Sequence, residues 1–200
     1  MVFIETSIFT KEIKRLLPDE EYRMLQTALM FRPDAGDIVA QQAIPIAYDD
    51  TAHSLFLKMV AAAPAVLRRV LPELKTGRFP RRPQEGPPSY FGGRRPEDGL
   101  IDWRRTADSI YNLVRATTHP YPGAFTFFNE KKLHVWRARP MDGGGGEAPG
   151  TVTSAAPLTV AAGRGRLELL SVQLEGEEET DGPGFSRTHN PEGSILGGNL

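Results

Sequence analysis

The sequence has no cysteine among its 200 residues. That absence excludes disulfide bonds, thiolate metal sites and cysteine nucleophiles, and it fits a reducing compartment. No run approaches the roughly 18 apolar residues that crossing a bilayer requires. Near the start, Glu5 and Lys11 stand where a signal peptide needs an unbroken apolar stretch. We therefore expect a cytoplasmic protein that makes no membrane contact, and we predict no metal site.

The chain also lacks a net charge of any size, because its 24 Lys and Arg residues face 25 Asp and Glu residues. No global field therefore steers it towards nucleic acid or a membrane. The charge is uneven locally. Residues 68–105 hold ten basic residues against five acidic ones, and residues 173–192 hold six acidic residues against Arg187 alone. The basic stretch is either solvated surface or an anion-binding site.

Glycine and proline are plentiful by contrast, at 20 and 17 residues. Many fall in residues 77–99, GRFPRRPQEGPPSYFGGRRPEDG, which have no hydrophobic periodicity and are typical of a surface linker. The glycine run 143–146 is expected to be a flexible insert between strands. The last 20 residues are again rich in glycine and proline, and we expect them to be loosely ordered.

Hydrophobic spacing predicts helices in the first part of the chain, beginning with two short segments at the N-terminus. A strand is predicted over 37–46. Asp49-Asp50-Thr51 then marks a helix start, because short polar side chains cap free N–H groups. Apolar positions from Leu55 to Leu74 follow at three- and four-residue steps. Pro64 is expected to kink this helix and Gly77 to cap its end.

The second part of the chain alternates short apolar segments with turn residues. A helix is predicted over 106–116. Turns are expected at 129–130 and 163–165, and five strands are predicted at residues 124–128, 132–138, 151–154, 157–161 and 166–174. Five short strands and one helix favour a small open β-barrel.

Several large side chains are expected to fill the junctions of this part. Trp103 should be buried where the linker meets the barrel. Tyr121, Pro122 and Trp136 should pack between the helix and the barrel, because aromatic side chains bury large areas. For His119 we expect a capping or packing role.

Several sequence blocks occur in an order typical of the folate-dependent formyltransferases. From about residue 33 the chain resembles that family in DAGDIVAQ (34–41), YFGGRRPEDGLIDW (90–103), IYNLVRATTHPYPGAF (110–125), KLHVWRARP (132–140) and the block 149–177. It is similar to the second half of methionyl-tRNA formyltransferases. The Arg-rich FGGRRPEDG makes it more similar to sugar-nucleotide formyltransferases such as the aminoarabinose enzyme.

The resemblance implies an α+β chain in which a remnant of a Rossmann-like formyltransferase domain precedes a C-terminal OB-like β-barrel. Members of the family transfer a formyl group from 10-formyltetrahydrofolate to an amine. An Asn and a His stabilise the oxyanion and an Asp handles the proton. By motif match, Asp34 is that Asp. The family's Asn-x-His pair lies upstream of the Asp, and no such pair precedes Asp34 here, so we expect this chain to be catalytically incomplete by itself.

Arg94 and Arg95 are the candidate substrate-binding residues, because two guanidinium groups present forked donors to a nucleotide diphosphate. The alternative is a solvated linker, or ion pairs with Glu97 and Asp98. The resemblance implies a sugar nucleotide or tRNA as substrate and a formyltransferase N-terminal domain as docking partner. Apolar faces left without a sheet in residues 1–76 would favour self-association.

Residues 1–37, MVFIETSIFTKEIKRLLPDEEYRMLQTALMFRPDAGD, resemble a different family, the RelE-type toxins that act on mRNA at the ribosome. Both families can carry Pro-Asp-Ala-Gly-Asp, so the two resemblances meet at residues 33–37 and suggest a hybrid. The alternative function is therefore a toxin-derived RNA- or ribosome-binding module without formyl transfer.

The sequence thus predicts five segments in an α+β protein with a short helical N-terminal segment. They are a toxin-like helical segment (1–32), a remnant of the formyltransferase catalytic domain (33–76), a linker rich in Arg, Pro and Gly (77–103), an OB-like formyltransferase C-terminal domain (104–176) and a flexible tail (177–200).

Overall fold

The structure is a computed structural model that describes residues 38–78, 82–83, 93, 95–144 and 146–197. Contacts between residues divide the chain into two compact units. One takes in the described parts of Met1–Ile46 and Leu55–Gly92, and the other takes in Ala47–Ser54 and the described parts of Gly93–Leu200. The short segment 47–54 therefore belongs with the C-terminal unit, although it lies far upstream of it in the sequence.

Helix α3 (Ala52–Thr76) begins where the polar triplet predicts it. The Thr51 side chain accepts from the Ser54 N–H at 3.1 Å, and the Ser54 hydroxyl accepts from the Thr51 N–H at 3.0 Å. This reciprocal pair satisfies two donors at the helix start. The helix continues through Pro64. It ends before Gly77, whose φ of +68° is the left-handed conformation typical of a glycine helix cap.

The strand predicted over residues 37–46 does not form among the described residues. Only Ile38 makes a bridge, to Arg82, with N···O distances of 2.7 and 3.1 Å. Apolar alternation alone does not make a strand, because each backbone N–H and C=O needs a neighbouring strand to bond to. Within the described chain, Arg82 is the one residue that bridges to this segment.

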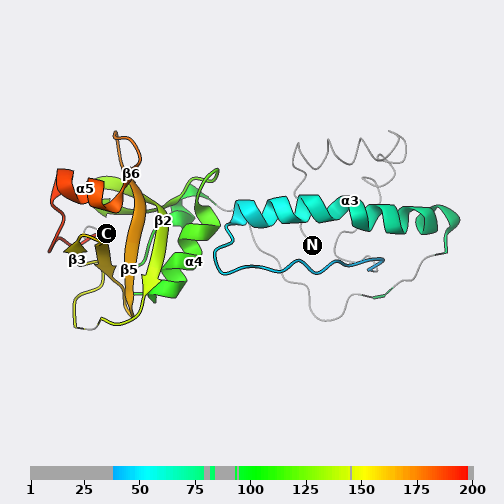
Figure 1. The fold of residues 1–200 in the computed structure, drawn as a ribbon, viewed down its shortest axis with the longest axis horizontal. Helices are drawn as coiled ribbons and strands as arrows, with labels where there is room; N and C mark the ends of the chain where they lie inside the picture. The colour runs from blue at the N-terminus through cyan, green and yellow to red at the C-terminus, as the bar shows by residue number, and fades with distance from the viewer. Residues whose placement is uncertain (1–37, 79–81, 84–92, 94, 145, 198–200) are drawn as a thin grey trace. The chain divides into compact units, whose positions relative to one another are not determined.

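The C-terminal unit is built on a six-stranded antiparallel sheet (Figure 1). Its order is β1-β2-β5-β4-β3, and β6 pairs with β5. The strands are β1 Ala124–Phe128, β2 Lys131–Met141, β3 Val152–Ala155, β4 Leu158–Ala161, β5 Arg166–Leu174 and β6 Thr180–Asp181. The five strands predicted from the sequence are confirmed. The tight turn between β1 and β2 has positive φ at both Asn129 and Glu130, as the twist of a two-residue hairpin requires.

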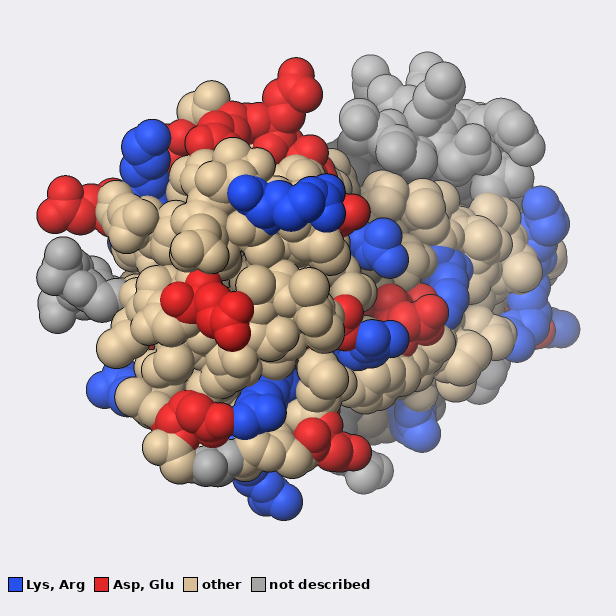
Figure 2. All heavy atoms as spheres, turned by 60° about the vertical axis from the view of Figure 1, so that its left-hand side comes forward, with Lys and Arg blue, Asp and Glu red and all other residues tan. Residues whose placement is uncertain are grey.

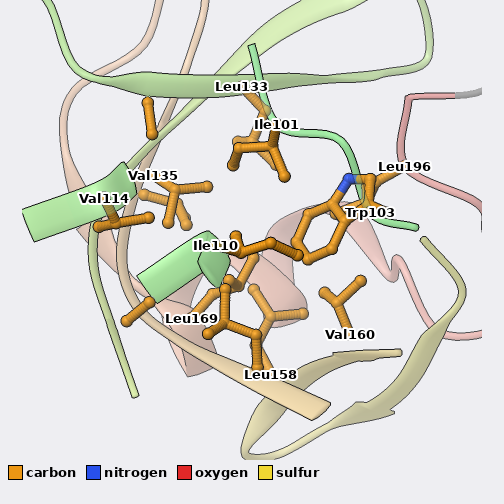
Figure 3. Packing of buried hydrophobic residues seen from close by; sticks show 14 of the residues in the cluster. Ile101, Trp103, Ile110, Val114, Leu133, Val135, Leu158, Val160, Leu169 and Leu196 are labelled. Carbon is orange, nitrogen blue, oxygen red and sulfur yellow. The ribbon is translucent and has the colours of Figure 1, made fainter. Parts of the chain in front are cut away.

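Helix α4 (Ala107–Thr117) closes one side of the core formed by the sheet. It starts where Thr106 accepts a hydrogen bond from the Ser109 N–H at 3.2 Å. Ile110 and Val114, four residues apart, lie on the buried face of α4 and pack among side chains from β2, β4 and β5 (Figure 3). Trp103 is buried in the same cluster, as the sequence predicted, with 5% of its surface exposed.

Within the tail predicted over residues 177–200, the described part forms a short strand, a helix and a return to the sheet. Helix α5 (Gly182–His189) follows β6, and its Phe185 is 1% exposed. Local pattern gives little warning of this helix, because it has only eight residues and three of them are Gly or Pro. The core, rather than helix propensity, holds it in place.

After α5 the chain returns to the sheet through residues 193–197, which we call the C-terminal strap; turns lie at both of its ends, and Ile195 forms a bridge to Thr151. The strap bonds to the outermost strands on both sides of the sheet. Its backbone hydrogen bonds are Gly193 N–H to Val152 O at 2.9 Å, Val152 N–H to Ser194 O at 2.8 Å, Leu196 N–H to Gly150 O at 2.8 Å and Gly197 N–H to Phe127 O at 2.8 Å. Leu196 is buried, at 3% exposed.

Candidate functional site

Of the site residues predicted from the sequence, the structure describes Arg95. Asp34 and Arg94 lie outside the described residues. Arg95 is exposed and precedes the short 3-10 helix η1 (Pro96–Gly99), and its backbone N–H donates to Asp98 Oδ2 at 2.7 Å. The predicted link to Asp98 therefore runs through the backbone rather than through the guanidinium group.

Two of the blocks that carry the family resemblance meet beside η1. A Cβ on Gly99 would lie 2.4 Å from the carbonyl oxygen of Gly123, so only glycine allows this approach of η1 to the loop 118–123. The Ile101 N–H donates to the Phe125 carbonyl oxygen at 2.8 Å and continues the contact along β1. The end of η1 at Gly99, four residues after Arg95, thus lies against the loop 118–123.

The loop is centred on a stack of three rings. The His119 imidazole lies 3.8 Å from the Trp136 indole, ring centroid to ring centroid, with 16° between the planes. His134 stacks on the same indole at 5.1 Å and 7°. Gly123 has a φ of +88°, and a Cβ there would lie 2.6 Å from the Trp136 ring. A larger residue at 123 would therefore displace the indole.

Packing of these side chains agrees with the sequence in part. Trp136 is 7% exposed and fills the junction as expected. Tyr121 is 39% exposed, so the prediction that it fills the junction is wrong. The His119 ring lies over Trp136, in the position that another bulky side chain could take. Tyr121 follows in a turn, and its backbone N–H donates to the Thr118 carbonyl oxygen.

A carboxylate completes the cluster from the other end of the sequence. His119 Nε2 lies 3.1 Å from Glu179 Oε2, and the Ser171 hydroxyl donates to Glu179 Oε1. The hydrogen bond from Ser171, with His119 as a second partner, lowers the pKa of Glu179. Glu179 is therefore ionised at neutral pH. No local signal in the sequence links residues 119 and 179, and only the sheet brings them together.

His134 differs from His119 in its surroundings. Burial, and secondarily the charge of Lys132, lowers the pKa of the His134 imidazole. Its Nδ1 is buried without a hydrogen-bond partner among the described residues. At neutral pH this side chain is therefore an uncharged ring that packs on Trp136.

A pocket of about 630 Å³ lies elsewhere in this unit, at the start of α4. The carboxyl groups of Asp108 and Asp142 and the guanidinium group of Arg164 line it. Tyr48 also lines it and donates its hydroxyl to Asp108 Oδ1 at 3.2 Å. The pocket thus presents both signs of charge and does not select one class of ion.

Charge is mixed over the surface as well. Figure 2 shows acidic and basic side chains interspersed on one face, with a group of acidic side chains at the top of the view. In the described part of the chain there is no group of three or more side chains suited to holding a metal ion. None of the helices described here is long and apolar enough to cross a membrane.

His119 in this cluster faces a carboxylate and an indole. The indole N–H of Trp136 donates to the Gln173 side-chain oxygen at 3.1 Å, and the Gln173 amide nitrogen donates to the Glu177 carbonyl oxygen at 3.0 Å, so both donors are already taken up. Asp34 lies outside the described residues. The arrangement positions loop 118–123 and η1 beside each other.

Residues 94–190 match the family model described as formyl transferase, C-terminal domain. Among solved structures, HypX from Aquifex aeolicus in complex with tetrahydrofolic acid is similar, with a TM-score of 0.55 and 18% identity over 78% of this chain and 27% of HypX. A variant of that HypX gives a TM-score of 0.56 at 16% identity, over 78% and 28% of the two chains.

Methionyl-tRNA formyltransferase from Clostridium thermocellum is 28% identical over 53% of this chain and 45% of that protein, with a TM-score of 0.42. The present chain thus spans less than half the length of each of these proteins. At 16–18% identity, HypX shows a shared fold alone. The family match covers the η1 segment, loop 118–123, the whole sheet and α5. Residues 94–190 of this chain are therefore a formyl transferase C-terminal domain.

Proposed function

We propose that the chain works as the C-terminal half of a folate-dependent formyltransferase that formylates the amine of a sugar nucleotide. The observation that carries this proposal is the formyl transferase C-terminal domain at residues 94–190. Within it, the end of η1 at Gly99, four residues after Arg95, lies against Gly123 of the loop 118–123. This contact supports a shared substrate-facing surface, with Arg94 and Arg95 as the groups for the diphosphate.

The chain needs a second component for chemistry. Formyl transfer requires donors for the oxyanion as well as the carboxylate of Asp34. The sequence has no Asn-x-His pair upstream of Asp34. We therefore propose that a formyltransferase N-terminal domain supplies these groups and holds 10-formyltetrahydrofolate. HypX was solved with tetrahydrofolic acid, which supports a folate as the formyl carrier in proteins of this fold.

Helix α3 is the proposed docking element for that domain. Leu57 and Met59 are large apolar side chains that are 47% and 53% exposed. Two residues apart, they lie on different sides of the helix, and each exposes apolar surface that favours association with another surface. In this proposal, residues 33–76 are a remnant of the Rossmann-like catalytic domain, and the sheet with its strap is the OB-like barrel of the family.

A formyl-transfer assay tests the proposal directly. The full chain is incubated with 10-formyltetrahydrofolate and UDP-aminoarabinose, with and without an added formyltransferase N-terminal domain. We expect background rates for the chain alone and turnover when the N-terminal domain is added. Methionyl-tRNA as the acceptor in a parallel reaction distinguishes the two acceptor classes.

Variants of the chain sharpen the assay. Replacing Arg95 by Ala should raise KM for the sugar nucleotide and leave kcat within about twofold, because a diphosphate contact contributes to binding in the ground state. Arg187→Ala, in α5, is the matched control. Turnover by the chain alone would refute the proposal that the chain is catalytically incomplete. RNA binding that weakens steeply with salt, without turnover in any mixture, would favour the toxin-derived alternative instead.

A further inference from the structure

The pocket at the start of α4 is bordered by the turn 162–165, which glycine allows to approach the helix closely. A Cβ at Gly163 would overlap the carbonyl oxygen of Arg104, so only glycine permits this approach. The Ala107 N–H, in the first turn of α4, donates to the Arg164 carbonyl oxygen at 2.9 Å. The position of Arg164 beside the helix start is therefore fixed by backbone contacts.

The end of β2 packs against the same turn and brings a second charged group to the pocket. Gly165 has a φ of +79°, and a Cβ there would lie 3.2 Å from the Met141 carbonyl oxygen. Asp142 follows Met141 directly and lines the pocket together with Asp108 of α4 and Arg164 of the turn. Three separate segments thus bring two carboxyl groups and one guanidinium group to one cavity.

These charged groups leave much of their bonding capacity unused. Among the described residues, neither Asp142 nor Arg164 forms an ion pair or a side-chain hydrogen bond, although both line the same space. Asp108 accepts from the Tyr48 hydroxyl through Oδ1, and no described group donates to its Oδ2. A guanidinium group donates to a carboxylate, and carboxylates accept from an ammonium group. A ligand that carries both signs of charge can therefore bond to all three side chains.

Tyr48 adds an aromatic wall to the pocket. Its ring stacks on Tyr111 with 5.2 Å between the ring centroids, and 67% of its surface stays exposed. An aromatic ring packs against an alkyl chain and attracts an ammonium group. The pocket therefore suits a ligand whose charged groups are joined by a short aliphatic chain.

We propose that this pocket binds a basic amino acid, a ligand with one carboxylate and two ammonium groups. Its three charges complement the three charged side chains one for one. The ligand carboxylate bonds to Arg164, and the ammonium groups bond to Asp108 and Asp142. The proposal does not depend on the proposed formyl transfer.

Isothermal titration calorimetry of the full chain with L-lysine and two analogues tests the proposal. Cadaverine is lysine without the carboxylate, and 6-aminohexanoate is lysine without the α-ammonium group. We expect L-lysine to bind about tenfold more tightly than either analogue, because each analogue loses one charged contact. Lysine that binds no more tightly than both analogues, or that does not bind, would overturn the proposal.

Variants of the chain locate the binding. Arg164→Gln should weaken lysine binding about tenfold without weakening cadaverine binding, since cadaverine has no carboxylate to lose. Asp142→Asn should weaken the binding of both ligands. The controls Arg187→Gln and Glu192→Gln remove the same charges outside the pocket and should stay within about twofold, because solvent screens distant charges.

Circular dichroism of each variant checks that it is folded, and the comparison of ligands on the unaltered chain needs no variant. Lysine affinity that is unchanged in Arg164→Gln, or that falls equally in the two controls, would place the binding outside this pocket and overturn the proposal.

Discussion

At the scale of single residues, Trp103 combines an apolar and a polar role. The indole is buried in the core, and its Nε1–H donates to Thr126 Oγ1 at 3.0 Å. The Thr126 side chain is fully buried. A buried polar pair of this kind contributes little while both partners are present, and it costs much when one is left alone.

Replacing Trp103 by Phe should therefore lower the free energy of unfolding by about 1–3 kcal/mol, because the Thr126 hydroxyl loses its donor in a dry environment. Urea unfolding followed by circular dichroism measures the change. Replacing both partners, Trp103→Phe with Thr126→Val, should recover part of the loss. A double variant that is as unstable as the sum of the two single variants would contradict this account.

His134 gives the folded state a dependence on pH. Burial lowers the pKa of its imidazole below the ordinary value of 6.5. Below that value the unfolded chain binds a proton that the folded chain does not, so stability falls as the pH drops below about 6.5. The free energy of unfolding should therefore be lower at pH 5.5 than at pH 7.5.

The matched variant His134→Gln removes the titrating group and should flatten this part of the pH profile. Glu179, whose pKa is lowered, contributes in a separate window, because its stabilisation is lost at the acid pH values where carboxylates take up protons. An unchanged slope between pH 5.5 and 7.5 in the variant would assign the effect to another group.

At the scale of elements, loop 118–123 shows how glycine fixes the position of a loop against a strand. Gly123 and Gly143 have nearly the same φ, +88° and +85°. They differ in their surroundings, since a Cβ at 123 would strike Trp136 at 2.6 Å and a Cβ at 143 would meet nothing within 4 Å. Alanine substitutions at these two glycines therefore separate the cost of backbone strain from the cost of steric overlap.

Gly143→Ala should cost about 1–2 kcal/mol, the penalty of an alanine in the left-handed region. Gly123→Ala should cost more, by a further ~1–3 kcal/mol for overpacking, and should alter the fluorescence of the displaced Trp136. Chemical denaturation of both variants measures the difference. Equal losses in the two variants would mean that the loop moves away from the indole without cost.

At the scale of the whole molecule, the described residues of the two units differ in how much core they contribute. Among these described residues, the buried cluster lies in the C-terminal unit, from Ile101 to Leu196. Among the α3 side chains that the structure describes, only Val70 is buried. Stability follows the apolar area removed from water, so the C-terminal unit should be the more stable.

We therefore expect unfolding in two steps. Both tryptophans of the sequence, Trp103 and Trp136, belong to the C-terminal unit, so their fluorescence reports that unit. Helical circular dichroism has a large contribution from α3, with its 25 residues. In urea, the dichroism signal should begin to fall at lower concentration than the fluorescence changes. Coincident transitions would show that the two units unfold together.

The secondary structure of the C-terminal unit was largely predictable, because each signal is local. Alternating apolar residues in β5 and the turn at Asn129-Glu130 depend on neighbours in the sequence, as does the start of α3 at Thr51. The strand expected over 37–46 failed for the opposite reason, since a strand also needs a partner. In the candidate site, too, local features were predictable and contacts between distant residues were not. The sequence located the blocks around Arg95 and His119, and it gave no sign of Glu179.

The sequence by itself determined the family of residues 94–190, the strands β1 to β5 and the helix α4, because short-range patterns of polarity and glycine encode them. Only the tertiary structure decided that segment 47–54 joins the C-terminal unit, that Glu179 meets His119 and that residues 193–197 close the sheet. These contacts join residues far apart in the chain. They are made by backbone hydrogen bonds, single side-chain hydrogen bonds and a few buried side chains, none of which leaves a periodic trace in the sequence.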